Sequence, residues 1–271
     1  MSHDSILAWL ETCELAARAG GEQLLAWRGR FQTREKGAAD LVTDADIASQ
    51  RAIQAVIASR YPEHAFIGEE QGKSGGTLER DQMGWIVDPL DGTTNYVHGY
   101  PNYAVSVALA RGSQLLAGVI FDPLRNECYS AGEGHGAWCN GTRLRTTNAS
   151  HLADALVAVS LPARVQRDSP DLQDFIEVVQ VSQAVRRSGS AAINLAQVTS
   201  GALDAFWATH IHPWDVAAGV LLVREAGGLV TARDGGNFDL WNPHFVAAAG
   251  AGVHRELLAA LRPFSRSSGS P

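Results

Sequence analysis

The chain has 271 residues, of which 45% are hydrophobic and 19% are charged, and its formal net charge is −7. This length is enough for one large domain or for two subdomains that share a core. The acidic balance argues against nucleic-acid binding, which uses a basic surface, and no apolar run approaches the roughly 20 residues of a membrane helix.

The first 150 residues are predicted to form two helices followed by a sheet rich in hairpins. Apolar residues at helical spacing predict helices over residues 5–28 and 43–60, with a loop over 36–40 between them. Asn140-Gly141 is a strong signal for a two-residue hairpin turn. Short apolar runs bounded by turn residues predict strands over 65–68, 85–87, 103–110, 114–122, 127–130 and 137–139, with a polar loop over 71–82.

Near Ser150 the pattern changes to an alternation of strands and helices. Strands are predicted over 156–160, 185–187, 205–207, 229–231 and 245–248, and helices over 171–181, 191–199, 215–226 and 254–261. The sequence therefore predicts an α/β (α+β) protein of two fused subdomains. Their ranges are 1–150, with most candidate ligands and a mainly antiparallel sheet, and 151–264, followed by a disordered Ser/Gly tail over 265–271.

Acidic residues gather at four places that are predicted strand ends or helix starts, where sheet proteins tend to place their chemistry. These residues are Asp40, Asp44 and Asp46, then Glu69 and Glu70, then Asp88 and Asp91, and finally Asp215. Structural alternatives exist for each group. Thr43 and Asp46 have capping-box spacing, Asp215 could cap the helix that follows it, Asp88 and Asp91 could shape a turn, and Glu69-Glu70 could be a solvated loop edge.

Residues 88–94, with the sequence DPLDGTT, are the strongest candidate for ligand binding. Pro89 favours an extended backbone before it, and Gly92 permits the close approach of another group. Thr93 and Thr94 add hydroxyls and backbone N–H groups that suit a phosphate. Two carboxylates ~4 Å apart repel by roughly 4 kcal/mol at an effective dielectric constant near 20. If the four acidic segments converge, a cation such as Mg²⁺ is therefore expected, because it prefers oxygen ligands and shares them with phosphates.

Other site chemistries find less support. The chain has neither a GxxxxGK[ST] loop nor a GxSxG elbow. Residues 132–136 are glycine-rich but precede a hairpin, so they are interpreted as a turn. His210-Ile211-His212 is interpreted as part of an alternating strand rather than as a zinc site, because no cysteine ligand or HExxH motif accompanies it.

Three segments resemble the signatures of the inositol monophosphatase family. They are Gly68-Glu69-Glu70, residues 88–96 (DPLDGTTNY) and residues 214–219 (WDVAAG). The similarity extends in order and spacing from about Ser5 to Gly250. It implies Mg²⁺-dependent, lithium-sensitive hydrolysis of small phosphate monoesters, a layered αβαβα fold and a homodimer.

The resemblance also implies which residues bind metal, with two to three Mg²⁺ ions in the site. Glu69, Asp88 and the backbone carbonyl of Leu90 would hold the first ion. Asp88, Asp91 and Asp215 would hold the second, and a third, weaker ion would use Glu69 and water. Such an arrangement agrees with phosphoryl transfer, which requires in-line positioning and charge neutralisation more than covalent help. No phosphoenzyme is expected.

The remaining roles follow from the same resemblance. Asp46 and Thr93, together with Glu69, would orient and activate the attacking water. Asp91 and the backbone N–H groups of Gly92 and Thr93 would contact the substrate and its phosphate. The segment Gly189, Ser190 and Ala191 would contact the substrate's hydroxyls, and Lys36 lies where the family has a loop lysine near the metals.

One departure from the family pattern affects the choice of substrate. Many inositol-specific members have a glutamate seven positions before the Trp-Asp aspartate, where this chain has Ala208. Inositol 1-phosphate is the first candidate, and histidinol phosphate, fructose 1,6-bisphosphate, glycerol phosphates and nucleotide phosphates stay open. 3′-Phosphoadenosine 5′-phosphate is less favoured, because its phosphatases usually have lysine in place of Thr94. A metal- or sugar-phosphate-binding protein without turnover, or one that acts by contact with another protein, is the alternative from a different class.

The location and partners are predicted from simple features. The polar N-terminus lacks the basic and apolar segments of a signal peptide. Cys13, Cys128 and Cys139 form no CxxC pair, and their odd number favours reduced thiols. A cytoplasmic protein is expected, without nucleic-acid or membrane partners, and the homodimer is implied by the resemblance alone.

Overall fold

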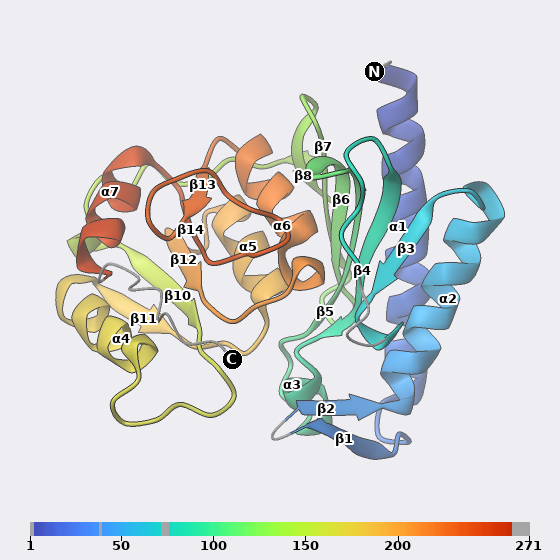
Figure 1. The fold of residues 1–271 in the computed structure, drawn as a ribbon, viewed down its shortest axis with the longest axis horizontal. Helices are drawn as coiled ribbons and strands as arrows, with labels where there is room; N and C mark the ends of the chain where they lie inside the picture. Colours follow the sequence, from blue (N-terminus) through green and yellow to red (C-terminus); the bar gives the residue numbers. More distant parts are fainter. Residues whose placement is uncertain (1–2, 38–39, 72–75, 262–271) are drawn as a thin grey trace.

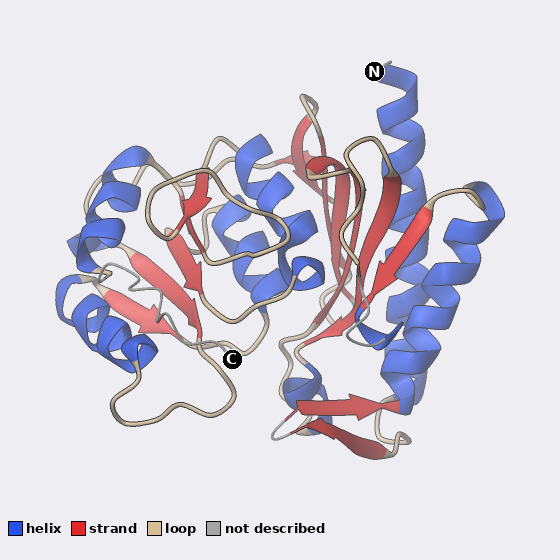
Figure 2. Cartoon of the chain, in the orientation of Figure 1, coloured by secondary structure: helices blue, strands red, loops and turns tan. Residues whose placement is uncertain are grey.

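Helices and sheets alternate in five layers (Figures 1 and 2). This computed structural model describes residues 3–37, 40–71 and 76–261, without the side chains of 35–37, 40, 41 and 71. The layers confirm the predicted αβαβα arrangement. From one side to the other, the helical layers are α1 (His3–Trp27) with α2 (Asp44–Arg60), α5 (Ala191–Ser200) with α6 (Pro213–Glu225), and α4 (Pro170–Val181) with α7 (Ala251–Ala260).

The larger sheet lies between the first two helical layers. Its strand order is β3-β4-β5-β6-β7-β8-β9, with β3 parallel to β4 and every other described pair antiparallel. Trp85 and Val87 pack towards α1 and α2, whereas Ile86 packs towards α5 and α6. Both faces are therefore buried, which explains the continuous apolar runs. The strands are β3 (Ala65–Gly68), β4 (Met83–Asp91), β5 (Ala104–Arg111), β6 (Gln114–Asp122), β7 (Glu127–Gly132), β8 (Gly136–Cys139) and β9 (Thr142–Arg143).

The smaller sheet has the strand order β11-β10-β12-β14-β13. β10 is parallel to both β11 and β12, so these three strands present their carboxyl ends at one edge. β14 is antiparallel to its two neighbours. The strands are β10 (Leu156–Ser160), β11 (Ala184–Arg186), β12 (Ala205–Ala208), β13 (Leu229–Ala232) and β14 (Phe245–Ala248).

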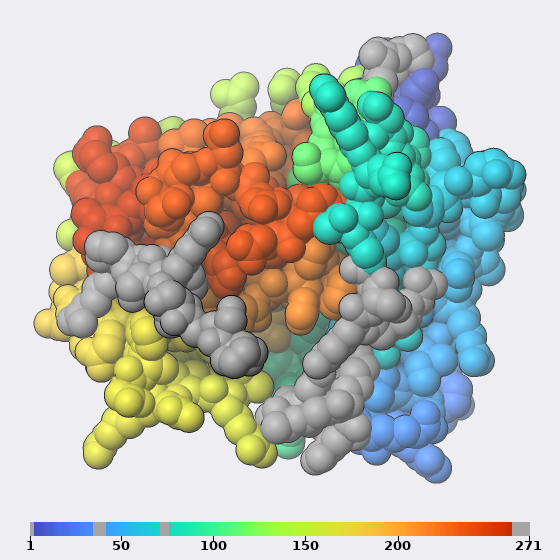
Figure 3. Space-filling model, viewed as in Figure 1, coloured from blue at the N-terminus to red at the C-terminus, as the bar shows by residue number. Residues whose placement is uncertain are grey.

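The central helices α5 and α6 join the two halves of the chain, which occupy opposite sides of the molecule (Figure 3). One hydrophobic core contains side chains from both sheets and from both helices, among them Ile86, Leu195 and Phe206. α6 lies very close to β6, because a Cβ atom on Gly118 would come within 2.9 Å of the Cα atom of Ala218. The start of α6 is fixed to the larger sheet by the Ser106 hydroxyl, which donates to the carbonyl of residue 214 at 3.1 Å.

The predicted loop over residues 36–40 is wrong. β1 (Thr33–Gly37) and β2 (Asp40–Thr43) form an antiparallel pair instead. β1 has the sequence TREKG, which offers no apolar alternation that could signal a strand. Its ladder is supported by the ion pair between Arg34 and Asp44, at 2.9 Å.

The predicted strand at residues 210–212 is also wrong. β12 ends at Ala208, and His210 has a left-handed backbone with φ of 53° in the loop that leads to α6. The change of sheet falls between β9 and β10, around Ser150, and the division into subdomains there stays a prediction. The predicted tail over 265–271 lies outside the described residues. Among the residues that are described, no helix combines the length and apolar character of a membrane span.

Candidate active site

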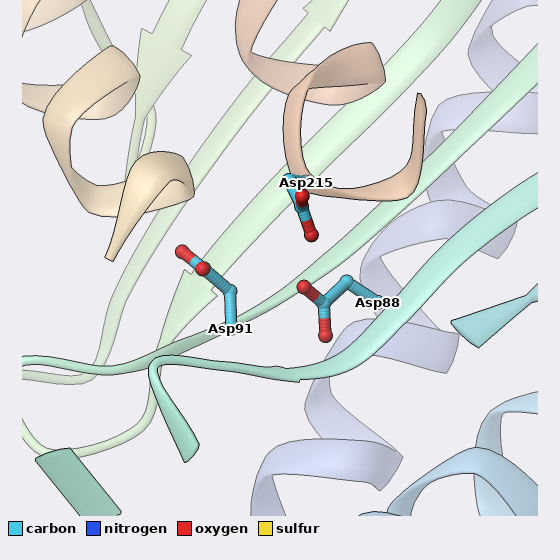
Figure 4. Close-up of side chains that lie close together, drawn as sticks. All are labelled: Asp88, Asp91 and Asp215. Atoms are coloured by element: carbon cyan, nitrogen blue, oxygen red, sulfur yellow. The ribbon is translucent and has the colours of Figure 1, made fainter. Parts of the chain in front are cut away.

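Three buried or half-buried carboxylates meet between the two halves of the molecule (Figure 4). Asp88, Asp91 and Asp215 each have an oxygen within 4.8 Å of the others. The first two come from the end of β4 and the third from the first turn of α6. The structure thus brings together two of the acidic segments that the sequence singled out, although they lie far apart along the chain.

The end of β4 explains how two aspartates so close in sequence reach one point. The strand continues to Asp91, beyond the end predicted at Val87, but its register with β5 shifts between Asp88 and Asp91. The backbone N–H of Leu90 donates to Asp88 Oδ1 at 2.9 Å, and the Ser49 hydroxyl donates to the carbonyl of residue 89 at 2.8 Å. The irregular strand end is therefore held by α2 and by its own side chain.

Asp91 connects the larger sheet to α5. Its Oδ2 accepts hydrogen bonds from the Ser190 hydroxyl at 2.5 Å and from the backbone N–H of Ala192 at 2.7 Å. Ser190 is also the residue that caps α5, through its contact with the N–H of Ile193. One carboxylate thus belongs to the acidic cluster and also completes the first turn of a helix from the other half.

Asp215 has a similar double placement. It is the third residue of α6, and its Oδ2 accepts from the backbone N–H of His212 at 2.8 Å, which makes it part of a capping box. Its carboxylate also lies in the cluster with Asp88 and Asp91. The Asp215 carboxylate is therefore part of the capping box and also part of the acidic cluster.

The electrostatics of the cluster favour a bound cation. Burial, reinforced by the carboxylates of Glu69, Asp91 and Asp215, raises the pKa of Asp88 well above its usual value. Burial also raises the pKa of Asp215, and it raises the pKa of Asp91 to about 6 despite the Ser190 hydrogen bond. Glu69, in the 3₁₀ turn η1 (Glu69–Gln71), is thus close enough to act on the cluster without belonging to the three-oxygen group.

Asp46 forms a second carboxylate centre beside the cluster. It is fully buried, and its Oδ2 accepts from the Thr43 backbone N–H at 2.8 Å and hydroxyl at 2.5 Å, which confirms the predicted capping box. Its other oxygen, Oδ1, lies 3.2 Å from the Thr93 hydroxyl, which is also 3.1 Å from the carbonyl of Leu90. Burial raises the pKa of Asp46 to about 6, and the nearby carboxylate of Glu70 adds to the effect.

The turn after β4 is shaped by contacts that sequence reasoning missed. Gly92 has φ of 94° and precedes the short helix α3 (Thr93–Val97). The Asn95 side-chain amide donates to the carbonyls of Asn102 at 2.6 Å and Ser188 at 2.9 Å, and the Asn102 amide also donates to Ser188. Asn95 is the last residue but one of the segment DPLDGTTNY, and its place in that segment was the only sequence signal for its role. These amides fix the turn against the segment before α5.

Gly92→Ala is expected to destabilise the protein by about 1–3 kcal/mol, because a side chain is strained at positive φ. The added Cβ would also come within 3.0 Å of the carbonyl of Asn102 and 3.3 Å of that of Gly189. Thermal unfolding measures the effect. Gly99→Ala is the matched control, because Gly99 has φ of 68° but open space around its Cβ position. Equal losses in both variants would show that close packing at Gly92 contributes nothing.

A cavity of about 680 Å³ opens from the cluster towards the carboxyl edge of the smaller sheet. Of the predicted substrate segment, Gly189 and Ala191 line the cavity, whereas Ser190 is buried behind it. Ala208 is fully buried in β12 and is absent from the cavity wall. The described lining residues are Asp91, Thr94, Asn95, Tyr100, Val159, Ser160, Leu161, Ala163, Arg187, Ser188, Gly189, Ala191, Thr209, His210, Ile211 and Asp215.

One acidic candidate, Asp44, lies away from the cluster, and two other residues singled out in the sequence have side chains that are not described. Asp44 accepts from the Gln32 backbone N–H at 3.1 Å and pairs with Arg34, so it supports the β1–β2 hairpin. Lys36 belongs to β1, but its side chain, like that of Asp40, lies outside the described part of the structure.

Comparison with known proteins agrees with this geometry. The family model described as "Inositol monophosphatase family" matches residues 8–267. An inositol-1-monophosphatase of Mesorhizobium japonicum is 39% identical over 259 residues, covering 94% of this chain and 96% of the relative. A Pseudomonas aeruginosa protein named Nus factor SuhB is 40% identical over 254 residues, covering 92% and 93%. The solved inositol monophosphatase of Anabaena superposes with a TM-score of 0.83 at 35% identity, covering 95% of this chain and 96% of that one.

Proposed function

The chain belongs to the inositol monophosphatase family and is a phosphatase of that family, and from this premise we propose Mg²⁺-dependent hydrolysis of a small phosphate monoester, with inositol 1-phosphate as the first candidate. The observation that carries the proposal is the meeting of Asp88, Asp91 and Asp215 beside a cavity. Three carboxylates with raised pKa values form an unfavourable group unless positive charge compensates them.

The donor set fits magnesium. All the groups offered are oxygens, the ligands that hard divalent cations prefer, and the cavity leaves space for a phosphate to complete the coordination. We propose that Asp88, Asp91 and Asp215 hold one ion and that Glu69, Asp88 and the carbonyl of Leu90 hold another. Divalent cations bound there supply the charge that neutralises the phosphate and acidifies a neighbouring water.

The side chains beside the cluster have distinct tasks in this proposal. Asp46 Oδ1 accepts a hydrogen bond from the Thr93 hydroxyl. The lone pairs of the Thr93 oxygen can then accept a hydrogen bond from the attacking water. The water is thereby oriented towards the phosphorus atom. The backbone N–H groups of Gly92 and Thr93 donate to phosphate oxygens, and Gly189 and Ala191 border the leaving alcohol, while Ser190 acts behind them by holding Asp91. Water attacks directly, so no side chain becomes phosphorylated.

Phosphate release is expected to depend completely on the divalent cation. We expect turnover of inositol 1-phosphate with Mg²⁺, its loss on addition of EDTA and its return when Mg²⁺ is restored, because the carboxylates alone repel the phosphate. Initial rates of phosphate release from inositol 1-phosphate, histidinol phosphate, fructose 1,6-bisphosphate and 3′-phosphoadenosine 5′-phosphate measure this. Metal-independent release, or a phosphoaspartate trapped by rapid quenching, would overturn the mechanism.

A second candidate function is binding without turnover. One relative is named Nus factor SuhB, which is not the name of a phosphatase, so a role other than hydrolysis is the second candidate. A lack of release from every ester, with Mg²⁺ still raising the unfolding temperature, would favour this candidate. We also propose a cytoplasmic homodimer, and light scattering at micromolar concentration tests the dimer.

A further inference from the structure

The outer wall of the cavity has basic side chains, and none of the described residues that line this wall is a carboxylate. Among the described lining residues, the only carboxylates are Asp91 and Asp215, both in the acidic cluster at the inner end. Arg187 and His210 are the lining side chains that can be cationic. A ligand that spans the cavity therefore meets an acidic, cation-binding inner end and a basic wall farther out.

The fold places these two basic residues on neighbouring loops. Arg187 follows β11, and His210 lies two residues after the end of β12. Both strands are parallel to β10, which lies between them, so both loops leave the same edge of the sheet. Adjacent strands are about 4.8 Å apart, which separates the two loops by roughly 10 Å. Such an edge is where open α/β sheets bind their ligands.

The Arg187 guanidinium is available for a ligand. Its side chain is exposed, and the hydrogen bond found for it is a long one, from Nη2 to the carbonyl of Pro162 at 3.4 Å. It forms no ion pair with any residue in the described part of the chain. A guanidinium has several N–H donors in a planar fork that matches a carboxylate or a phosphate.

His210 is held on the wall by an unusual backbone. Its φ is 53°, and the other two described non-glycine residues with positive φ are both asparagines, which tolerate that conformation well. Asp171 Oδ2 lies 3.8 Å from the ring Nδ1, and Asp171 Oδ1 accepts a hydrogen bond from the Thr209 hydroxyl. Because Nδ1 lies near Asp171, we assign contact with a ligand to Nε2 of this cavity-lining ring. A side chain kept at positive φ in a cavity wall is a reason to expect a ligand contact.

We propose that the substrates this site prefers are phosphate monoesters whose alcohol part carries a second anionic group, a phosphate or a carboxylate, bound by Arg187 and His210. The inference rests on the proposed phosphatase function and names its substrate class. The first phosphate occupies the inner end near Asp91 and Asp215. The second anion pairs with the Arg187 guanidinium, which has no ion-pair partner among the described residues, and contacts the His210 ring, whose Nδ1 lies 3.8 Å from Asp171. Ala208 is fully buried and adds no acceptor for neutral hydroxyls.

Matched substrate pairs test the proposal. Fructose 1-phosphate and fructose 1,6-bisphosphate differ by a distant phosphate, and glycerol 3-phosphate and 3-phosphoglycerate differ by a near carboxylate. With Mg²⁺, we expect kcat/KM to be at least about tenfold higher for the doubly anionic member of one pair. The difference should lie mainly in KM, because the second anion is bound alike in the ground and transition states. The pair in which kcat/KM differs shows whether the second anion is a phosphate or a carboxylate.

Arg187→Gln should reduce this preference about tenfold, and His210→Gly should reduce it severalfold. His210→Gly should also keep or raise the unfolding temperature, because glycine adopts positive φ without strain. Arg186→Gln is the matched control: Arg186 is exposed and adjacent but absent from the cavity wall, so the preference should persist. Equal effects of the two arginine variants, or no preference in either pair, would overturn the proposal.

Failure of this inference can be distinguished from failure of the proposed function. If glycerol 3-phosphate and fructose 1-phosphate are hydrolysed with Mg²⁺ but neither pair shows a preference, the phosphatase function stands and the second-anion site fails. If no ester is hydrolysed, the phosphatase function fails. Calorimetric binding of fructose 1,6-bisphosphate to the wild type and to Arg187→Gln then tests the basic wall directly, with equal affinities contradicting it.

Discussion

Asp88→Asn is expected to lower kcat by about two to four orders of magnitude, because the proposed metal site then lacks a charged ligand that both ions share. The fold should persist, since the amide oxygen can still accept the Leu90 N–H that Asp88 Oδ1 accepts at 2.9 Å. Asp215→Asn should behave similarly, because its amide oxygen can still accept from His212. Steady-state rates over a range of Mg²⁺ concentrations measure the loss.

Thermal unfolding separates this effect from damage to the fold. Without metal, Asp88→Asn should unfold at the same or a higher temperature than the wild type, because a buried like charge has been removed. Added Mg²⁺ should stabilise the wild type, by about 2.7 kcal/mol at one hundred times its Kd, and should stabilise the variant much less. Near-native activity in either variant would contradict the metal assignment.

Asp122→Asn provides the matched control. Asp122 is also buried, but its carboxylate accepts from the N–H groups of Leu124 and Arg125 and pairs with the Arg125 guanidinium. It therefore holds a turn rather than a cation. This variant should lose about 1–3 kcal/mol of stability while its activity stays within severalfold of the wild type.

Asp46→Asn is expected to lower kcat by about 100-fold to 10,000-fold, the range typical of general acid–base groups. The amide oxygen can replace Oδ2 as the acceptor for Thr43, so the cap of α2 should survive. The amide nitrogen then faces the Thr93 hydroxyl and can no longer accept its proton. The water-orienting arrangement is lost while the helix remains.

The rate and the unfolding temperature should thus change independently in Asp46→Asn. Asp44→Asn, two residues earlier on the same helix, is the control, because its carboxylate contacts Gln32 and Arg34 and faces the hairpin. It should keep its activity. A comparable loss of rate in both variants would mean that the position of α2, rather than the Asp46 carboxylate, controls turnover.

Much of the fold could be predicted because buried strands and amphipathic helices leave clear periodic patterns. The apolar runs that became β4, β5 and β6 are continuous because helices cover both faces of the sheet. The β1–β2 hairpin could not be found in the same way. Its strand TREKG is polar on both faces, and its stability comes from pairing and from the Arg34–Asp44 contact, which no local pattern records.

Predicting the site from the sequence depended on local motifs and failed where the chain changes direction. The sequence of residues 88–94 predicted a ligand-binding turn, and the structure places the carboxylates of Asp88 and Asp91 close together. The prediction of a strand at 210–212 was wrong. The alternation of His and Ile is typical of a strand, but the left-handed backbone of His210 turns the chain there. The hydrogen bonds of Asn95 and Asn102 could not be predicted from local sequence either, since both side chains donate to the carbonyl of Ser188, about ninety positions away.

The double role of Asp91 has a consequence for when the protein becomes active during synthesis. Asp91 belongs to β4, but it anchors the start of α5, and the cluster is complete only when Asp215 of α6 has joined it. A nascent chain that has emerged only as far as β9 has two of the three carboxylates, and it lacks Ser190 and Ala192, which donate to the Asp91 carboxylate. Because the metal site that we propose is incomplete until then, we expect hydrolysis to begin only after α6 has left the ribosome and the halves have docked. Activity would then report that the two halves of the chain have come together.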